Sequence, residues 1–466
     1  MPSLTRREAL AGLAAAAASG LPRSSGAATA KSEFLSTDIG ALEKVLVHSL
    51  SRHDDVLGQE DEGILPVVET DMLAAERQHA ALMELLRKSG AELIEIRDAL
   101  AGAIEVTRST GVLETWVRTT HPRLPWDPKR ITADVLLGRD ESTHYVLGPE
   151  GDARLLVSDS VSTIWTRDSA FMSPQGLVIC NAASRRRHRE NVLLRFLYRH
   201  SPMLDAFPVV FDAVQEGLII EGGDATVVDE RTLFLGTGNR TDPRIAPILA
   251  RRLDMDVLTV QTVAKDHMRR GPWSSSGKAS ALRALVLHLD TFFTLVGPKH
   301  ALCVPMLLEK EHAEDNPLAQ FIRGARSETK MPTDEAKAAL TILKGLGTVR
   351  MFRRGSGREE DLGGIKLVDY LRSQDYRFTF TGGELPDGDQ DRYRHFMEVT
   401  YPEQRRQASN VVQATPGRVI AYSGNPETEK ALKASGIEVD TFPGRELWAW
   451  HGGPHCLTQP LVRSRP

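Results

Sequence analysis

The spacing of apolar residues predicts a strand–helix–strand unit that recurs along the chain. Near the N-terminus, Val45–Val47 is predicted to be a short strand, and Ala74–Lys88 carries apolar residues on one face at helical spacing. Gly90 follows this helix, where glycine readily adopts the left-handed conformation of a helix cap, and Leu93–Ile96 then returns as a strand.

A second clear copy of the unit lies near the C-terminus. Val419–Tyr422 and Ile437–Phe442 are predicted strands, and Glu427–Ala434 between them is a predicted helix. Repetition of one unit indicates radial or stacked modules, but a doubly wound sheet also alternates strands and helices, so both architectures stay open at this point. Weaker copies have strands predicted at Leu177–Cys180 and Val209–Phe211, at Leu233–Leu235 and Val257–Val260, and at Phe292–Val296 and Ala301–Val304.

Two stretches break this rhythm. Residues at about 100–147 carry an uneven, mainly helical pattern and are predicted to form an insertion. Residues at about 309–405 are rich in charge and in glycine turns, so we expect loop excursions that act as lids or as partner contacts. The two stretches belong to one α/β domain that is predicted to span residues 31–466.

The first thirty residues have the features of an export signal. A twin arginine, Arg6-Arg7, precedes an apolar run from Ala9 to Ala18, and Ala28-Thr29-Ala30 provides a cleavage sequence. The segment resembles a twin-arginine signal, which carries folded proteins across a bacterial inner membrane, although Ala9 stands where that motif has a bulky apolar residue. Because the three features follow in the expected order, export to the periplasm or the medium is favoured over a disordered Ala-rich tail.

The overall composition excludes two classes of partner. A chain of 466 residues with a formal net charge of −4 lacks the basic excess of a nucleic-acid-binding protein. Beyond the signal, no apolar run is long enough to span a bilayer. The three cysteines are an odd number without a C-x-x-C pair, so the sequence predicts neither a disulfide framework nor a structural zinc site.

Acidic residues with the potential to bind a small cation follow two apolar runs. Asp168 is expected at the mouth of a strand, where a carboxylate can hold a guanidinium through two parallel hydrogen bonds. Glu221 and Asp224 enclose two glycines at the exit of a predicted strand, and their burial would require a cation or a shared proton. Taken alone, Asp168 is better explained by a surface salt bridge with Arg167, and the fragment of Glu221 and Asp224 also fits an acidic turn exposed to water.

A histidine and a cysteine complete this inventory. His288 and Asp290 follow another apolar run, and residues two apart on a strand face the same side, although a core histidine satisfied by its neighbour has the same pattern. Cys456 follows a Gly-Gly-Pro turn, and its thiolate would be a nucleophile if a nearby cation lowered the thiol pKa from about 8.5. Cys180 and Cys303 lie in apolar strands and fit buried, inert cysteines.

Together these fragments resemble the arginine deiminases, members of the guanidino-group-modifying superfamily. The resemblance extends from about Ser36 to Arg463, and it implies a five-bladed α/β propeller, the pentein fold, with a helical insertion at about 100–147. The fragments that carry it, in the family's order and at similar separations, are Thr166-Arg167-Asp168, Glu221-Gly222-Gly223-Asp224, His288-Leu289-Asp290-Thr291 and Gly452-Gly453-Pro454-His455-Cys456.

The resemblance also implies catalytic roles. Cys456 would attack the guanidinium carbon, while Asp168 and Asp290 would hold the guanidinium nitrogens. His288, coupled to Glu221, would protonate the leaving ammonia and then activate water, so that one group acts first as an acid and then as a base. The resemblance implies no metal and no organic cofactor.

The residues that would bind the rest of the substrate match the family less well. The family binds the substrate α-carboxylate through arginines, which align with Arg187 and Arg240, although the basic cluster around Arg187 equally fits a solvated helix start. Asp224 would support the site or contact the substrate amine. Ser162 replaces an asparagine that helps to bind the carboxylate, and His451 stands where the family often has an arginine or another polar residue.

The sequence therefore predicts a hydrolase that cleaves the guanidino group of L-arginine to citrulline and ammonia through a covalent Cys456 intermediate. The alternatives are an amidinotransferase, a deiminase for another guanidino compound such as agmatine or a substituted arginine, and a binding protein without turnover. The complete catalytic set argues against the last of these. The expected partner is a small guanidino molecule, with no nucleic acid and no membrane beyond export, and the oligomeric state stays open, a homo-oligomer included.

Overall fold

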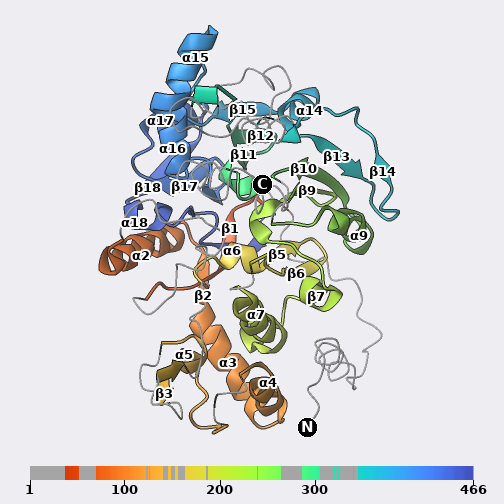
Figure 1. Cartoon of the computed structure of the whole chain (residues 1–466), viewed down its shortest axis with the longest axis vertical. Helices are drawn as coiled ribbons and strands as arrows, with labels where there is room; N and C mark the ends of the chain where they lie inside the picture. The colour runs from red at the N-terminus through yellow and green to blue at the C-terminus, as the bar shows by residue number, and fades with distance from the viewer. Residues whose placement is uncertain are drawn as a thin grey trace.

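The computed structural model describes residues 37–51, 70–121, 124, 126–139, 145–147, 153–155, 163–184, 187–238, 240–263, 286–304, 319–320, 323–324, 340 and 345–464. Within these residues the fold is mixed α/β (Figure 1), with five sheets of three or more strands and one two-stranded hairpin. The predicted export signal and Ser162 lie outside the described residues.

Each of the five sheets contains the same module, in which two antiparallel strands are followed by a helix and a strand parallel to the second. In one of them β16 (Val412–Thr415) pairs with β17 (Arg418–Tyr422), and α17 (Pro426–Ala434) leads to β18 (Glu438–Phe442). The predicted units are confirmed, and they form separate sheets rather than one doubly wound sheet. The equivalent elements are β5 (Ala170–Ser173), β6 (Gly176–Ile179), α7 (His188–His200) and β7 (Val209–Asp212); β8 (Ala225–Asp229), β9 (Thr232–Thr237), α9 (Ala246–Arg252) and β10 (Asp256–Gln261); and β11 (Phe293–Gly297), β12 (His300–Cys303), α14 (Leu367–Ser373) and β15 (Arg377–Phe380).

The remaining module is completed by the C-terminal strand. In it β1 (Leu42–Val47) pairs antiparallel with β19 (Gln459–Arg463) and, after α2 (Met72–Lys88), parallel with β2 (Glu92–Glu95). Arg463 adds a link to β16, because its Nη1 donates to Gly40 O at 2.6 Å and to Gln413 O at 2.7 Å. The first and last strands of the described chain, β1 and β19, are therefore neighbours in one sheet.

The module helices lie outside the sheets (Figure 1), because each has one apolar face. In α2, Leu82 and Leu86 are buried, and Asp71 caps the helix by accepting from Leu73 N at 2.9 Å and Ala74 N at 3.2 Å. Strands of neighbouring modules contact one another: β19 contacts β5, β8 contacts β11, and β16 contacts β1. The loops that precede these strands are thereby brought close together.

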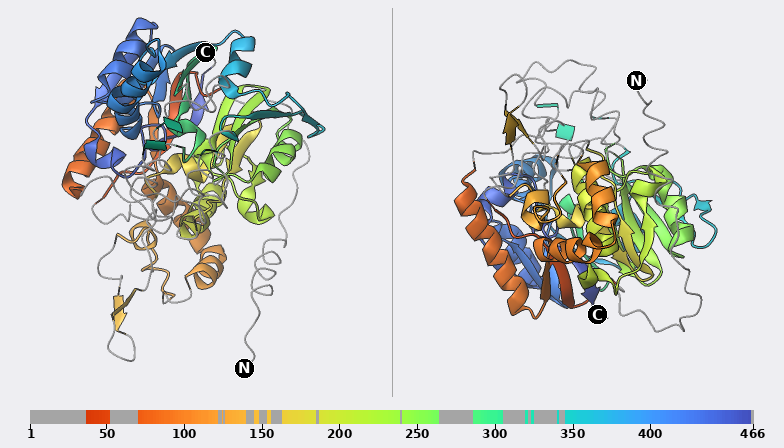
Figure 2. Two further views of the ribbon diagram at one scale, coloured as in Figure 1. Left: turned by 45° about the horizontal axis from the view of Figure 1, so that its top comes forward. Right: turned by 90° about the horizontal axis from the view of Figure 1, so that it is seen from below.

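The stretch that was expected to form a helical insertion projects from the sheets. It contains α3 (Ile96–Arg108), α4 (Val112–Thr120) and α5 (Ala133–Leu136). Helix α3 contacts α7 and buries Leu100 and Ile104 in the core that it shares with that module. Figure 2 shows the hairpin of β3 (Tyr145–Leu147) and β4 (Ala153–Leu155) apart from the five sheets.

The loop prediction for residues 309–405 is wrong in the described part, from residue 345 onward. There β13 (Val349–Phe352) and β14 (Glu359–Glu360) extend the sheet of β10, and α14 and β15 complete a module. Most charged residues of this part are at least partly exposed, although Lys366 and Glu403 are buried, while Leu367 and Leu371 are fully buried. The high charge therefore concealed an amphipathic pattern. Further elements in this stretch are α15 (Asp389–His395), the π-helical turn η8 (Phe396–Thr400) and α16 (Tyr401–Arg405).

Short helical turns connect the larger elements. None of the helices in the described ranges is both long enough and apolar enough to cross a bilayer. The connecting turns are η3 (Pro202–Leu204), α8 (Ala213–Glu216), η5 (Pro243–Ile245) and α18 (Arg445–Trp448).

The link made by Arg463 predicts a measurable contribution to stability. We expect Arg463→Met to lower the free energy of unfolding by about 2–6 kcal/mol, because two buried carbonyl oxygens lose their donor at about 1–3 kcal/mol each. Urea unfolding followed by circular dichroism measures this change. As the matched control, Arg418→Met removes a side chain that is 41% exposed and should cost less than about 1 kcal/mol. Equal losses in the two variants would contradict the role of Arg463.

Candidate active site

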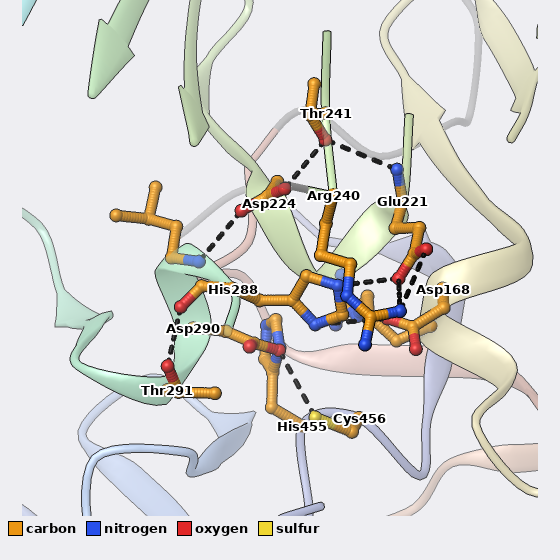
Figure 3. Close-up of polar contacts among 12 residues, drawn as sticks. Asp168, Glu221, Asp224, Arg240, Thr241, His288, Asp290, Thr291, His455 and Cys456 are labelled. Carbon is orange, nitrogen blue, oxygen red and sulfur yellow. Dashed lines mark hydrogen bonds and ion pairs between the residues drawn. The ribbon is translucent and has the colours of Figure 1, made fainter. Parts of the chain in front are cut away.

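The four predicted fragments lie on turns that directly precede the first strand of a module. Asp168 lies in α6 (Thr166–Ser169) before β5, and Asp224 ends η4 (Gly222–Asp224) before β8. Asp290 lies in η6 (Leu289–Thr291) before β11, and Cys456 lies in the turn before β19. Because neighbouring modules contact one another, the side chains on these turns gather at one site (Figure 3).

The local structure of three fragments differs from the prediction. Asp168 lies in a single helical turn, and Glu221 precedes a 3₁₀ turn rather than ending a strand. His288 and Asp290 do not share a strand face, because Asp290 is part of a 3₁₀ turn that Thr291 Oγ1 closes by donating to the carbonyl of His288 at 2.6 Å. The apolar residues just before Asp168 and His288 are buried outside any strand, and Ile220 before Glu221 is buried and forms a single β-bridge. Such buried apolar residues give the same sequence pattern as a buried strand.

His288 is held between two carboxylates. Its Nε2 lies 2.7 Å from Glu221 Oε2, and its Nδ1 lies 3.7 Å from Asp168 Oδ1. Burial by itself lowers the pKa of His288, but the negative charges of Asp168 and Glu221 outweigh burial and raise the pKa to about 10. A Cβ at Gly223 would lie 2.7 Å from Nδ1, so glycine is needed to admit the ring. The imidazole is therefore a cation at neutral pH and can donate a proton.

Asp224 anchors the turn that carries Asp290. Its Oδ1 accepts from Leu289 N at 3.0 Å, and its Oδ2 accepts from Thr241 Oγ1 at 2.7 Å. Burial raises the pKa of Asp224 to about 7, because the surroundings disfavour its charged form. Both carboxylate oxygens of Asp224 thus bond to protein groups that shape the site.

The Cys456 thiol lies beside a carboxylate and an amide. Its Sγ is 3.5 Å from Asp290 Oδ2 and 3.2 Å from Asn410 Nδ2. Burial, and then the negative charges of Asp290 and Asp168, raise the pKa of the thiol well above its usual range. The sulfur of the free protein is therefore protonated at neutral pH.

Two buried carboxylate oxygens near this thiol, Asp168 Oδ1 and Asp290 Oδ1, have no hydrogen-bond partner in the described part of the chain. Burial raises the pKa of Asp290, but the hydrogen bond of its other oxygen with His455 Nδ1 at 2.8 Å helps to bring the pKa below its usual value. A buried carboxylate that lacks donors is costly unless a cation binds to it. The arrangement can therefore bind a cation that has N–H donors.

Arg187 already contacts one of these carboxylates. Its Nη1 donates to Asp168 Oδ2 at 2.6 Å and lies 3.7 Å from Glu221 Oε2, while its Nε and Nη2 donate to Glu190 at 3.0 and 2.6 Å. Arg240 Nη1 donates to Glu221 Oε1 at 3.3 Å. Since Arg187 is 3% exposed, the alternative of a solvated helix start is wrong.

A metal ion is a further candidate for this cluster. Asp168, Glu221 and His288 each offer a ligand atom within 4.8 Å of the others. However, the guanidinium groups of Arg187 and Arg240 contact two of these residues, and the imidazole is itself positively charged. The negative charge is thus matched by side chains, and we assign no metal to it.

Some residues of the site were missed at the sequence level. Glu190 and Asn410 carried no recognisable motif, and His455 appeared only as the neighbour of the nucleophile. The position of Asn410, two residues before β16, corresponds to that of Asp168 before β5, a signal that becomes visible once the module boundaries are known. His451, which replaces a polar family residue, is buried and has a φ of 66°.

The site and the modules define a member of the guanidino-group-modifying enzymes. The sequence profile of the family described as arginine deiminase matches residues 136–351 and 390–463, more than half of the chain. The chain belongs to the arginine deiminase family, a family of hydrolases that act on C–N bonds.

Individual relatives are distant but cover most of the chain. The chain is 24% identical to an arginine deiminase of Metamycoplasma hominis over 92% of this chain and 96% of the relative, and 25% identical to one of Rhodococcus erythropolis over 84% and 87%. Among solved structures, the N-terminal domain of the cyanobacterial arginine dihydrolase ArgZ with bound product matches with a TM-score of 0.47 and 13% identity, over 90% of this chain and 97% of that one. A mutant of DDAH from Pseudomonas aeruginosa in complex with citrulline matches with a TM-score of 0.44 and 12% identity, over 90% and 99%.

The raised pKa of Asp224 predicts how stability changes with pH. Since the pKa rises from 3.8 to about 7 on folding, the folded state holds this proton more tightly, so the contribution of Asp224 is largest below about pH 4 and is lost as the pH rises through about 7. Asp224→Asn keeps an acceptor for Leu289 N and removes the titration. The wild-type advantage over the variant should therefore fall by up to about 1.4 kcal/mol per pH unit across this interval. Urea unfolding at several pH values measures it, and a constant difference would contradict the assignment.

Proposed function

We propose that the protein hydrolyses the guanidino group of free L-arginine to give citrulline and ammonia. The observation that carries this proposal is a pair of buried oxygens near the Cys456 thiol, Asp168 Oδ1 and Asp290 Oδ1, to which no residue of the described ranges donates a hydrogen bond. A guanidinium group is planar and positively charged, and its N–H donors can bond to carboxylates at two of its edges. Membership of the arginine deiminase family supports the same substrate class.

Substrate binding would generate the nucleophile. In the free protein, burial and the negative charges of Asp290 and Asp168 raise the pKa of the Cys456 thiol and keep it protonated. A guanidinium bound between these carboxylates neutralises their field and places positive charge beside the sulfur, so the thiol pKa falls and the proton leaves to solvent.

In the first half of the reaction, the Cys456 thiolate attacks the guanidinium carbon and forms a C–S bond. The adduct is neutral, because the negative sulfur has joined a cation. His288, a cation at neutral pH by its raised pKa of about 10, donates its proton to one terminal nitrogen. The C–N bond breaks, ammonia leaves, and a positively charged thiouronium stays on the sulfur.

In the second half, the now neutral His288 takes a proton from water, and the water oxygen bonds to the same carbon. The C–S bond then breaks and returns the thiolate, while the hydroxyl proton leaves as the ureido carbonyl forms. Glu221, 2.7 Å from His288 Nε2, fixes the imidazole and stabilises its charged form in both halves. The reaction consumes one water and releases one ammonia. The ammonia takes up the proton that leaves the hydroxyl group, so the product is an ammonium ion.

We assign the amino-acid end of the substrate to Arg187 and Arg240. For Arg187 this requires an exchange, in which Nη1 leaves Asp168 for the substrate carboxylate while the two bonds to Glu190 are kept. The exchange would free both oxygens of Asp168 for the substrate guanidinium. The assignment of Ser162 to the same carboxylate, and of Asp224 to the amine, rests on the family resemblance alone.

Two further proposals concern the whole chain. The five modules would form the blades of a five-bladed α/β propeller, a proposal supported by the contacts of β19 with β5, β8 with β11 and β16 with β1.

Export after removal of residues 1–30 rests on the sequence pattern alone. The mass and N-terminal sequence of the chain recovered from the periplasm would test it.

Loss of the nucleophile should abolish turnover. With L-arginine, the wild-type protein should release citrulline and ammonia in equal amounts, and Cys456→Ser should lower kcat by at least about 10³-fold, because a serine hydroxyl without an activating base is a poor nucleophile. Cys303→Ala, which removes a buried thiol in β12, is the control and should retain activity. Transfer of the carbon to an added amine without citrulline would identify an amidinotransferase instead.

The assignment of Arg187 predicts a change in substrate preference. Arg187→Gln should lower kcat/KM for L-arginine by roughly 10–100-fold, the loss of one hydrogen bond to a charged group. Agmatine has the same guanidinium and no carboxylate, so its kcat/KM in the same variant is the internal control and should change less. An equal loss for both compounds would contradict the assignment and would place the effect on Asp168 instead.

A further inference from the structure

We propose that Asn410 is a catalytic residue, whose amide N–H donates a hydrogen bond to the sulfur of Cys456 and stabilises the thiolate at the start and end of the reaction. This inference rests on the proposed cysteine chemistry, but it can be tested without turnover. No motif at the sequence level pointed to Asn410, and it belongs to none of the four fragments.

The contacts of Asn410 surround the nucleophile. Its Nδ2 lies 3.2 Å from Cys456 Sγ and donates to Asp290 O at 3.1 Å, and its Oδ1 accepts from Cys456 N at 3.2 Å. Asn410 is fully buried, so water does not compete for these bonds. One side chain thus fixes both the backbone and the sulfur of residue 456.

The orientation of the Asn410 amide follows from its partners. Cys456 N can only donate and Asp290 O can only accept, so Oδ1 must face the former and Nδ2 the latter. Rotation of the amide by half a turn would place Nδ2 against the donor Cys456 N and Oδ1 against the acceptor Asp290 O, so both hydrogen bonds would be lost. The group that faces the sulfur is therefore an N–H donor, which favours the negatively charged thiolate.

The place of Asn410 in the fold matches that of the other site residues. It lies just before β16, the first strand of its module, as Asp168 lies before β5, Asp290 before β11 and Cys456 before β19. The glycine turn of the nucleophile is shaped to this side chain, because a Cβ at Gly453 would lie 2.3 Å from Asn410 Oδ1. Asn410 is thus the residue that the module of β16, β17 and β18 contributes to the site.

The surrounding charge explains why the sulfur needs such a donor. Asp290 lies 3.5 Å from Sγ, and in the free protein the thiol can donate to its Oδ2 while accepting from Asn410. When a guanidinium takes the place of the thiol proton on Asp290, the proton goes to solvent and the thiolate keeps the bond from Asn410. The bond weakens when the C–S bond forms and strengthens again when that bond breaks, so it assists both attack and release.

The test is the pH dependence of thiol reactivity, measured as the rate of alkylation by iodoacetamide with and without a low concentration of guanidinium ion as a probe of the empty site. Asn410→Ala should raise the apparent thiol pKa by about one unit or more, because a charge-assisted hydrogen bond is lost. Asn410→Asp keeps the size and the acceptor for Cys456 N, but it replaces the donor by a negative charge. Its shift should therefore be larger, and kcat should fall at least about tenfold in both variants.

A matched control separates this role from a structural one. Asn425, which is also buried and lies between β17 and α17 of the same module, donates to Arg406 O and Tyr422 O and not to the sulfur. Asn425→Ala should leave the thiol titration unchanged, whatever it does to the urea midpoint. If Asn410→Ala does not fold, the isosteric Asn410→Asp variant supplies the comparison.

The possible failures are distinguishable. If the wild type makes citrulline but both Asn410 variants keep the wild-type thiol pKa and kcat, the role of Asn410 is wrong and the proposed function stands. If the Asn410 variants shift the thiol pKa but the wild type releases no citrulline, the hydrogen bond stands and the proposed function is wrong.

Discussion

The constraint on which this site depends is the burial of several carboxylates beside one thiol. Asp168, Glu190, Glu221, Asp224 and Asp290 are all buried within one network of turns, against the guanidinium groups of Arg187 and Arg240 and the imidazole of His288. The consequences differ from residue to residue. The carboxylates outweigh burial and raise the pKa of His288 to about 10, whereas burial together with Asp290 and Asp168 raises the pKa of the Cys456 thiol well above its usual range. Two carboxylate oxygens receive no hydrogen bond from the described residues. A site in this state favours the binding of one more cation, and binding itself would switch the thiol to its reactive form.

The fold keeps these groups in place by repeating one module. Each module packs its apolar residues into cores that it shares with neighbouring modules. The turn before the first strand of a module is then available to carry a polar side chain. Five such turns contribute Asp168, Asp224, Asp290, Asn410 and Cys456. The nucleophile lies in the turn before β19, so the pairing of β19 with β1 helps to hold the sulfur near the carboxylates. The stability of this strand pair and the geometry of the site are therefore linked.

The sequence predicted the modules well, because their strands and helices have strong apolar periodicity and glycine stops, as in α2 and β17–α17–β18. The strand prediction failed at Asp168, Glu221 and His288. Buried apolar residues precede the helical or 3₁₀ turns there and give the sequence pattern of a strand. The sequence prediction also failed in the described part of residues 345–405, where charged outer faces hid β13 and α14. The catalytic fragments were recognised through family resemblance, whereas the partnership of Arg187 with Asp168 and of Asn410 with Cys456 depends on contacts between distant segments, which periodicity does not encode.

The central claim is that the Cys456 sulfur bonds to the carbon of a guanidinium held by Asp168 and Asp290. Mass spectrometry of the protein after rapid acid quenching during turnover of L-arginine tests this claim most directly. The account predicts an adduct with the mass of arginine less ammonia, confined to the peptide that contains Cys456. Steady citrulline release without any adduct on that peptide, or with an adduct on another residue, would contradict it.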